Sequence, residues 1–306
     1  MNNTPLLLAF PEYLNQTQAL AAAGGWPLAE VKVHRFPDGE SRLLLPENLP
    51  EHVIFCRSLD HPNDKLVELL LAAAGARELG AQILTLVVPY LCYMRQDMAF
   101  HPGEVVSQRH IGKLLAQSFD RLVTVDAHLH RISSLREAVP LEHAINLSAT
   151  VPMGEFLAGR LASPLLVGPD EESEQWVAAI AEHQHLDFMC ATKQRFGDRD
   201  VQIALPEGNW RGRNVVLVDD VASSGRTLEV AARLLQVQQP ASVSVLVTHA
   251  LFAGDALERL RAVGVGHVWS CDSIPHPSNC VSLAGLLAEA LREPSKQIRQ
   301  IDEIFP

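Results

Sequence analysis

The sequence lacks several features that would assign it to simpler classes of protein. Only five cysteines occur in 306 residues, and no two of them form a CxxC pair. A disulfide framework or a thiolate metal site therefore finds no support, and we expect a reducing, cytoplasmic compartment. The longest apolar run, residues 83–91, is far shorter than the roughly 20 residues that cross a bilayer. We accordingly expect no membrane partner.

Positive charge is also scarce. Lys and Arg number 25 against 36 Asp and Glu, so the formal net charge is 25 − 36 = −11. Nucleic acids and anionic membranes bind through basic side chains that neutralise phosphates, so neither is expected as a partner. A small anionic ligand in a local basic pocket stays compatible with this balance. The phosphate-loop pattern GxxxxGK[ST] is absent as well, which disfavours kinases of that type.

Short β-branched runs alternate with longer helical patterns along the chain. Nearly continuous apolar runs, such as ILTLVV at 83–88 and VVLV at 215–218, are typical of parallel strands buried on both faces. Helical periodicity occupies the stretches between such runs, and the clearest are 63–79, 107–118, 174–182 and 227–238. The alternation predicts an α/β fold with crossover helices.

The length exceeds the usual size of one domain. A boundary near 146–152 divides the strands into two sets and predicts domains 1–148 and 149–306. Both halves contain an apolar strand that ends in aspartate, at 122–126 and at 215–220, which suggests an internal duplication.

The sharpest motif is VVLVDDVASSGRTL at 215–228. Ligands of open α/β sheets bind at the carboxyl ends of the strands, where Asp219 and Asp220 lie in this motif. The small residues 223–225 allow backbone N–H groups to approach a phosphate, and the following helix directs its positive end at the same anion. Carboxylates are strong acceptors for sugar hydroxyls. The motif therefore predicts a phosphorylated-sugar site; the alternative, a simple helix cap, leaves the two acids unexplained.

This motif resembles the phosphoribosyl-pyrophosphate loop of type I phosphoribosyltransferases. Eight further segments extend the resemblance, in the same order, to the ribose-phosphate diphosphokinase family over nearly the whole chain; they are 35–40, 63–64, 89–97, 124–128, 168–170, 193–195, 248–250 and 271–275. The resemblance implies two tandem type I phosphoribosyltransferase-like domains, each a mainly parallel sheet flanked by helices. The first would serve ATP and the second ribose 5-phosphate.

The reaction implied by the resemblance is transfer of the β,γ-diphosphoryl group of ATP to the anomeric hydroxyl of ribose 5-phosphate, with Mg2+ and release of AMP. The residues that match the catalytic pair are Lys193 and Arg195, ahead of a closing loop at 196–200. Those that match the ATP contacts are Asp38, Gly39 and Glu40, contributed by a neighbouring subunit in the family, and Arg95, Gln96 and Asp97. Those that match the metal positions are His128 and Asp170. Those that match the ribose 5-phosphate loop are Asp219, Asp220, Ser223, Ser224, Gly225, Arg226 and Thr227. A homo-oligomer, either dimer or hexamer, is also implied.

The chain departs from the family pattern on parts that face substrate. Glu171 and Glu172 follow Asp170, Ser223 replaces an aspartate, Arg226 adds a charge, and Met98 replaces a basic residue. The leading hypothesis is a divergent enzyme; the alternative is a weak or inactive regulatory homologue that binds nucleotide or sugar phosphate. A phosphoribosyltransferase that consumes the product would leave Arg95 and Gln96 without a task. Locally, the acidic turn 38–40 and His128 also have ordinary structural interpretations.

Overall fold

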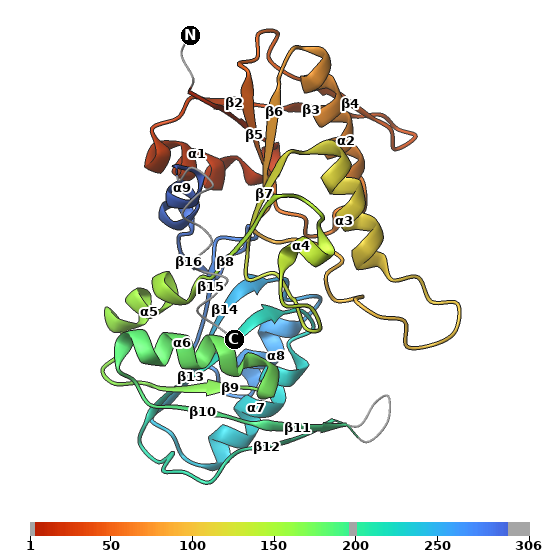
Figure 1. Cartoon of the computed structure of the whole chain (residues 1–306). Coiled ribbons are helices and arrows are strands. Elements are labelled where there is room, and N and C mark those ends of the chain that lie inside the picture. Colours follow the sequence, from red (N-terminus) through yellow and green to blue (C-terminus); the bar gives the residue numbers. More distant parts are fainter. Residues whose placement is uncertain (1–3, 196–200, 293–306) are drawn as a thin grey trace. The chain divides into compact units, whose positions relative to one another are not determined.

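The computed structural model describes residues 4–195 and 201–292, without the side chains at 193–195 and 201–202. The chain divides into two compact units, one made of residues 1–147 with 283–306 and the other of residues 148–282. Each unit is built on a six-stranded sheet with helices packed against it (Figure 1). Every pairing within the two large sheets is parallel, which confirms the predicted α/β class.

Unit 1 contains a sheet in the order β2-β1-β5-β6-β7-β8. The bounds of its strands are β1 Leu6–Ala9, β2 Leu28–Glu30, β5 His52–Cys56, β6 Ile83–Val87, β7 Arg121–Val125 and β8 His143–Leu147. Its helices are α1 Leu14–Gly24, α2 Pro62–Glu78, α3 Ser107–Ser118, α4 Leu135–Ala138 and α9 Ala284–Arg292, with a 3-10 turn at Pro11–Tyr13. A separate antiparallel hairpin joins β3 Lys32–Arg35 to β4 Ser41–Leu44.

Unit 2 contains a sheet in the order β10-β9-β13-β14-β15-β16. The bounds of its strands are β9 Leu165–Gly168, β10 Phe188–Cys190, β13 Asn214–Ala222, β14 Ser242–Ala250, β15 His267–Cys271 and β16 Asn279–Val281. Its helices are α5 Thr150–Ala158, α6 Glu174–Gln184, α7 Arg226–Val237 and α8 Ala256–Ala262, with a 3-10 turn at Glu171–Ser173. A second antiparallel hairpin joins β11 Thr192–Arg195 to β12 Val201–Ala204.

The sequence pattern explains these elements directly. Residues 53–56 of β5 and 215–218 of β13 are continuous apolar runs, and all of them are buried, as central strands of a covered sheet require. Helix α7 presents Leu228, Ala231 and Leu235 on one buried face, at helical spacing. These side chains belong to the core of unit 2 together with the apolar strand residues.

The two sheets repeat one topology, which agrees with the predicted internal duplication. The strand orders correspond position by position, and each unit carries its hairpin after the edge strand. Strand β13 is third in its sheet and matches β5, whereas β7, at Arg121–Val125, is fifth and matches β15. The segments 122–126 and 215–220, which both consist of an apolar run ending in aspartate, therefore occupy different positions in the two sheets.

The C-terminal helix is grouped with unit 1, and not with the second domain in which the predicted boundary placed it. Helix α9 packs against α1 and is grouped with unit 1 (Figure 1), whereas the prediction placed all of 149–306 in the second domain. Helix α5, which follows the last strand of unit 1, packs against α6 of unit 2. Helix α9 thus follows the last strand of unit 2 but belongs to unit 1, and α5 follows the last strand of unit 1 but belongs to unit 2. No local sequence pattern indicates these connections.

Within the described residues, no helix combines the length and apolar character needed to cross a membrane. The five cysteines are free thiols, and three of them, Cys56, Cys92 and Cys271, are buried. Burial raises the pKa of Cys92 to about 12, which is typical of a small core residue rather than a reactive thiol.

Candidate active site

The turn between β13 and α7 requires a glycine at position 225. Gly225 adopts φ +68°, in the left-handed region that L side chains rarely occupy. A Cβ atom there would also lie 3.2 Å from the Cβ of Ala256, closer than ordinary contacts. The strand therefore passes into the helix through a tight turn that brings the backbone of 223–227 to the carboxyl end of the sheet.

The backbone of this turn leaves its donors unpaired. Its carbonyl groups are bound: Ala222 O accepts from Phe252 N at 2.8 Å, and Ser223 O accepts from Ala253 N at 2.9 Å. In the described part of the chain, none of the N–H groups of residues 223–227 donates a hydrogen bond. Consecutive free N–H groups at the start of a helix attract an anion, because the helix dipole adds positive potential at the same place. The chemistry of the turn therefore suits a phosphate.

The side chains of the predicted sugar-phosphate loop differ in exposure. Ser224 and Arg226 are exposed, Ser223 and Thr227 are half-buried, and Gly225 is buried. The Arg226 side chain, which adds a positive charge relative to the family pattern, is thus accessible to an anion.

Asp219 and Asp220, the two acids of the motif, precede this turn at the end of β13. Burial, and after it the charges of Asp220 and Asp170, raises the pKa of Asp219 well above its ordinary value. Asp219 Oδ1 accepts from Asp220 N at 3.0 Å, and Asp220 Oδ1 accepts from Val221 N at 2.7 Å, so both side chains are held near the backbone. Sugar hydroxyls or a cation would relieve the repulsion among these oxygens.

Asp170 begins the 3-10 turn Glu171–Ser173 that follows β9. Its side chain and the buried Ser173 form a reciprocal cap, and Ser173 Oγ donates to Asp170 O at 2.6 Å. Glu171 and Glu172 are both exposed, in contrast to Asp170. Their carboxylates therefore retain contact with solvent, which screens their charge from a phosphate bound nearby.

Arg259 of α8 supports the turn, and no motif in the sequence indicated it. Its Nη2 donates to Ser224 O at 2.6 Å, and its Nε donates to Glu229 Oε2 at 3.0 Å. A guanidinium with two fixed acceptors is a rigid brace for the carbonyl side of the loop. Only the long separation of 35 residues along the chain hid this contact from sequence reasoning.

We expect Arg259→Ala to raise KM for the predicted sugar phosphate about five- to ten-fold, because a charged hydrogen bond that orders the turn is lost. Steady-state kinetics with varied sugar phosphate would measure this. Arg233→Ala is the matched control, since Arg233 Nη2 also binds Glu229, at 2.9 Å, but makes no contact with the turn. An equal rise in both variants would assign the effect to Glu229 instead.

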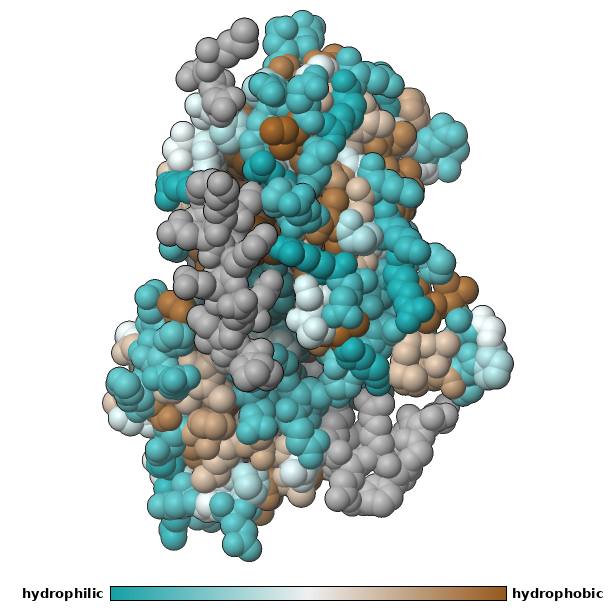
Figure 2. Space-filling model, viewed as in Figure 1, coloured by the Kyte–Doolittle hydropathy of each residue, from teal (hydrophilic) through white to brown (hydrophobic). Residues whose placement is uncertain are grey.

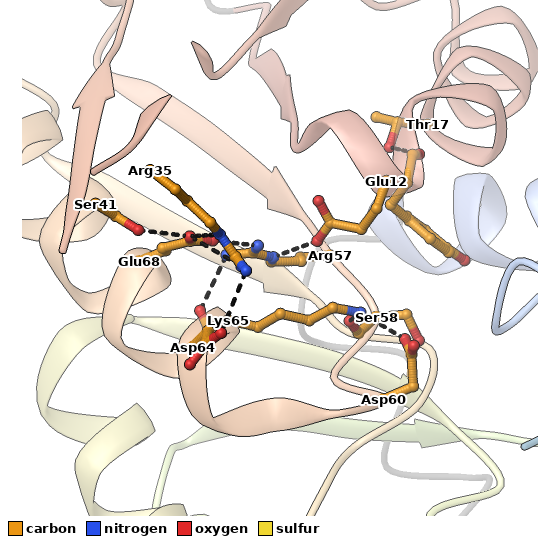
Figure 3. A network of polar contacts seen from close by, with 11 residues as sticks. Glu12, Thr17, Arg35, Ser41, Arg57, Ser58, Asp60, Asp64, Lys65 and Glu68 are labelled. Carbon is orange, nitrogen blue, oxygen red and sulfur yellow. Dashed lines mark hydrogen bonds and ion pairs between the residues drawn. The ribbon is translucent and has the colours of Figure 1, made fainter. Parts of the chain in front are cut away.

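In unit 1 the loop after β5 corresponds to the turn after β13 in unit 2. A lysine side chain, Lys65, binds to this loop. The ammonium group of Lys65 donates to Ser58 O at 3.0 Å and to Asp60 Oδ1 at 2.7 Å (Figure 3). Lys65 is buried. The ammonium group of Lys65 is thus already engaged with two acceptors, unlike the N–H groups of the turn after β13.

The predicted ATP-binding residues Asp38, Gly39 and Glu40 lie at the tip of the β3–β4 hairpin. Phe36 N donates to Glu40 O at 2.8 Å and Asp38 Oδ1 accepts from Glu40 N at 3.1 Å, with Gly39 at φ +93°. All three residues are exposed. Their side chains are thus presented on a closed, well-defined turn and are free to meet a ligand.

The second predicted ATP segment, 95–97, is divided by burial. Arg95 is exposed and Gln96 is half-buried, as ligand contacts require, but the Asp97 side chain is only 2% exposed. Asp97 Oδ1 accepts from Arg131 Nη1 at 2.6 Å, and its Oδ2 has no partner among the described residues. The geometry favours Asp97 as a support for the segment, and its contact with nucleotide stays a prediction.

Gln108, another residue that the motifs did not indicate, holds this segment from α3. Its backbone N donates to Gln96 O and its side-chain Nε2 donates to Met94 O, both at 3.3 Å. The amide is buried, so both contacts exclude water. The segment that carries Arg95 is therefore fixed on both sides of that residue.

The predicted metal ligand His128 lies in the loop after β7, in unit 1. Its ring stacks on that of His130, with ring centroids 6.0 Å apart and an angle of 23° between the planes. Over the described residues, no group of three or more His, Cys, Asp or Glu side chains has the arrangement of a metal site. Magnesium commonly takes one or two carboxylates with water and substrate phosphates, and Asp170, Asp219 and Asp220 supply oxygen donors of that kind.

Lys193 and Arg195 lie on β11, paired in register with Ile203 and Val201 of β12. Their side chains, and the predicted closing loop at 196–200, are outside the described residues. The catalytic role of the pair stays a prediction.

Comparison with known proteins identifies the relatives of this chain. Residues 7–118 match the N-terminal domain of ribose phosphate pyrophosphokinase, and residues 154–291 match the phosphoribosyl transferase domain. The chain is 35% identical over 290 residues to the ribose-phosphate pyrophosphokinase of Methanopyrus kandleri, covering 94% of this chain and 98% of that one. It is 32% identical over 259 residues to that of Thermococcus kodakarensis, covering 85% and 91% of the two chains.

Among solved structures, a phosphoribosylpyrophosphate synthetase from Mycobacterium smegmatis has the same fold, with a TM-score of 0.81 at 21% identity over 94% of this chain and 98% of that one. The paired sheets are thus two tandem type I phosphoribosyltransferase-like domains. On the two domain matches and the identity to full-length relatives, the chain belongs to the ribose-phosphate pyrophosphokinase family.

Proposed function

We propose that the protein transfers the diphosphoryl group of ATP to the anomeric hydroxyl of ribose 5-phosphate, giving 5-phosphoribosyl 1-diphosphate and AMP. The observation that carries the proposal is the turn 223–227, whose free N–H groups suit a phosphate while Asp219 and Asp220 beside it suit sugar hydroxyls. The relatives named above are pyrophosphokinases, which supports the choice of reaction.

In the proposed reaction the anomeric hydroxyl oxygen attacks the β-phosphorus of ATP. The bond from that phosphorus to the oxygen bridging the α- and β-phosphates breaks, AMP leaves, and the hydroxyl proton is released. The turn 223–227 and the two carboxylates orient the sugar; Lys193 and Arg195 would neutralise charge that develops on the transferred group. Arg95 and Gln96, with the hairpin tip 38–40, would hold the nucleotide.

Magnesium fits the oxygen donors at this site. Burial, and after it the charges of Asp220 and Asp170, raises the pKa of Asp219, so a cation beside this carboxylate would be stabilising. Asp170 and the aspartates at 219 and 220 would hold it; His128, which matches the other metal position of the family, stays a prediction. When bound, Mg2+ would neutralise the oxygens of the transferred diphosphoryl group.

A homo-oligomer, dimer or hexamer, is proposed as well. Large apolar side chains are exposed on the β3–β4 hairpin and on the loop before α3, namely Phe36, Leu44, Phe100 and Val105. Hydrophobic groups also interrupt the hydrophilic face that Figure 2 shows. Exposed apolar groups of this size favour contact with another protein surface. A cytoplasmic location stays a prediction.

The experiment is to mix the protein with ATP, ribose 5-phosphate and Mg2+ and to measure AMP. We expect AMP only when the sugar phosphate is present, and a fall of about 10²–10³-fold in kcat for Lys193→Ala, with substrate binding retained. AMP formed without the sugar would indicate simple hydrolysis instead.

The second candidate is a regulatory homologue that binds substrates without turnover. The replacement of an aspartate by Ser223 and the exposed charge of Arg226 favour it, because both change the sugar-phosphate loop itself. Binding of ribose 5-phosphate without AMP formation, across a range of Mg2+ concentrations, would decide for this candidate.

A further inference from the structure

The Glu68 carboxylate of α2 is a buried junction between three parts of unit 1 (Figure 3). Its Oε1 accepts from Ser41 Oγ at 2.8 Å and from Arg35 Nε at 3.3 Å. Its Oε2 accepts from Arg57 Nη2 at 2.5 Å. The side chain is 1% exposed, so these hydrogen bonds exclude water and hold the carboxylate in one orientation.

Two of these partners form the base of the hairpin turn that carries Asp38, Gly39 and Glu40. Arg35 and Ser41 are directly opposite each other in the register of β3 and β4, as the last pair before the turn. One carboxylate oxygen therefore fixes both strands of the hairpin at the point where the exposed turn begins.

The same helix also contacts the second predicted ATP segment. Asn63 Oδ1, in the first turn of α2, accepts from Tyr93 Oη at 2.5 Å, and Tyr93 precedes Arg95 by two residues. Asp64 pairs with Arg35 at 3.3 Å. The first two turns of α2 thus support both segments that the proposed function assigns to the nucleotide.

Arg57 holds the other side of the junction. Its Nε donates to Glu12 Oε1 at 2.6 Å and its Nη1 donates to Lys65 O at 3.0 Å, while the guanidinium lies 3.9 Å from the centroid of the Phe10 ring. All three guanidinium nitrogens of Arg57 donate hydrogen bonds, and the residue is 1% exposed. The side chain is therefore held in one position. Arg57 therefore fixes the position of the Glu68 carboxylate, and the carboxylate in turn fixes the position of the β3–β4 hairpin.

We propose that Glu68 is a positioning residue for nucleotide binding, which orders the turn 36–40 through Arg35 and Ser41 before the nucleotide arrives. A turn ordered in advance costs less conformational entropy on binding, so its loss should weaken affinity without changing the chemical step. The inference rests on the proposed function, because the turn and the segment at Arg95 are assigned to ATP there.

The test removes the hairpin side of the junction and keeps the buried Arg57–Glu68 pair. We expect Ser41→Ala and Arg35→Ala each to raise KM and Kd for ATP about two- to ten-fold, and the double variant to raise them further, with kcat and KM for ribose 5-phosphate unchanged. Ser41→Thr keeps a hydroxyl and should restore affinity. Arg42→Ala is the matched control: it removes the same charge from the same hairpin, at an exposed position.

Calorimetric titration with ATP accompanies the kinetics, so the inference is decided even without turnover. A wild-type protein that binds ATP but forms no AMP would end the proposed function, and the variants' Kd values would still test Glu68. An ATP affinity unchanged in the double variant, or lowered equally in Arg42→Ala, would overturn the inference. A wild-type protein that binds no ATP would overturn both.

Discussion

Replacing Asp219 with asparagine is expected to raise the melting temperature while it lowers kcat/KM for ribose 5-phosphate about ten-fold or more. Burial and the neighbouring charges of Asp220 and Asp170 raise the pKa of Asp219, so its ionised form is unfavourable in the folded protein. Asparagine removes that charge and should stabilise the free protein by about 1 kcal/mol, or roughly 2–4 °C in a chain of this size. The loss of activity follows because a carboxylate binds a sugar hydroxyl more strongly than an amide does.

The pH dependence of this effect has a definite sign. A carboxyl group whose pKa is raised on folding costs no stability below its ordinary pKa of 3.8, and the cost grows as the pH rises from there through its raised value. The stability difference between the variant and the wild type should therefore be larger at neutral pH than near pH 4. Mg2+ should also raise the melting temperature of the wild type more than that of the variant, since the cation offsets the same repulsion.

Thermal unfolding at several pH values and steady-state kinetics would measure both effects. Glu155→Gln is the control, because it removes one negative charge from an exposed position of unit 2. A lower melting temperature in Asp219→Asn would show instead that the ionised carboxylate contributes net stability to the folded protein.

Replacing Arg57 with alanine is expected to lower the free energy of unfolding of unit 1 by about 3–5 kcal/mol. The substitution leaves Glu68, at 1% exposure, without its strongest partner, and an uncompensated buried charge is among the most destabilising changes known. The pKa of Glu68 agrees: burial raises it, but hydrogen bonds from Arg57 and Ser41 and the charges of Arg57 and Arg35 outweigh burial and lower it overall. The carboxylate is thus ionised at neutral pH and depends on the guanidinium.

Hydrogen exchange followed by mass spectrometry would locate this loss. Peptides from β5 and α2 should exchange much faster in Arg57→Ala, while peptides from β13 and α7 keep the exchange rates of the wild type. Arg42→Ala serves as the control for loss of an arginine from unit 1. Equal exchange rates of the β5 peptides in Arg57→Ala and Arg42→Ala would mean that water replaces the missing guanidinium with little loss of stability.

Much of the fold followed from local pattern. Continuous apolar runs such as 83–88 and 215–218 indicated buried parallel strands, and helical spacing predicted α3 with its observed bounds, Ser107–Ser118. The sugar-phosphate turn was also readable, because a strand, two acids, small residues and a helix follow one another without a gap. Short strands such as β2 and β16, of three residues each, escaped prediction since so few residues carry no clear period.

The sequence by itself indicated the family, the α/β class and the position of the turn at 223–227, because each motif along the chain is encoded in neighbouring residues. Only the tertiary structure decided that α9 completes unit 1, that β5 rather than β7 matches β13, and that Asp97 is buried against Arg131. It also revealed the supports, Arg259 behind the sugar-phosphate turn and Glu68 beneath the hairpin. The physical reason is that the contacts behind these features join residues about 30 or more positions apart. Their contribution to stability depends on burial that only the folded chain creates.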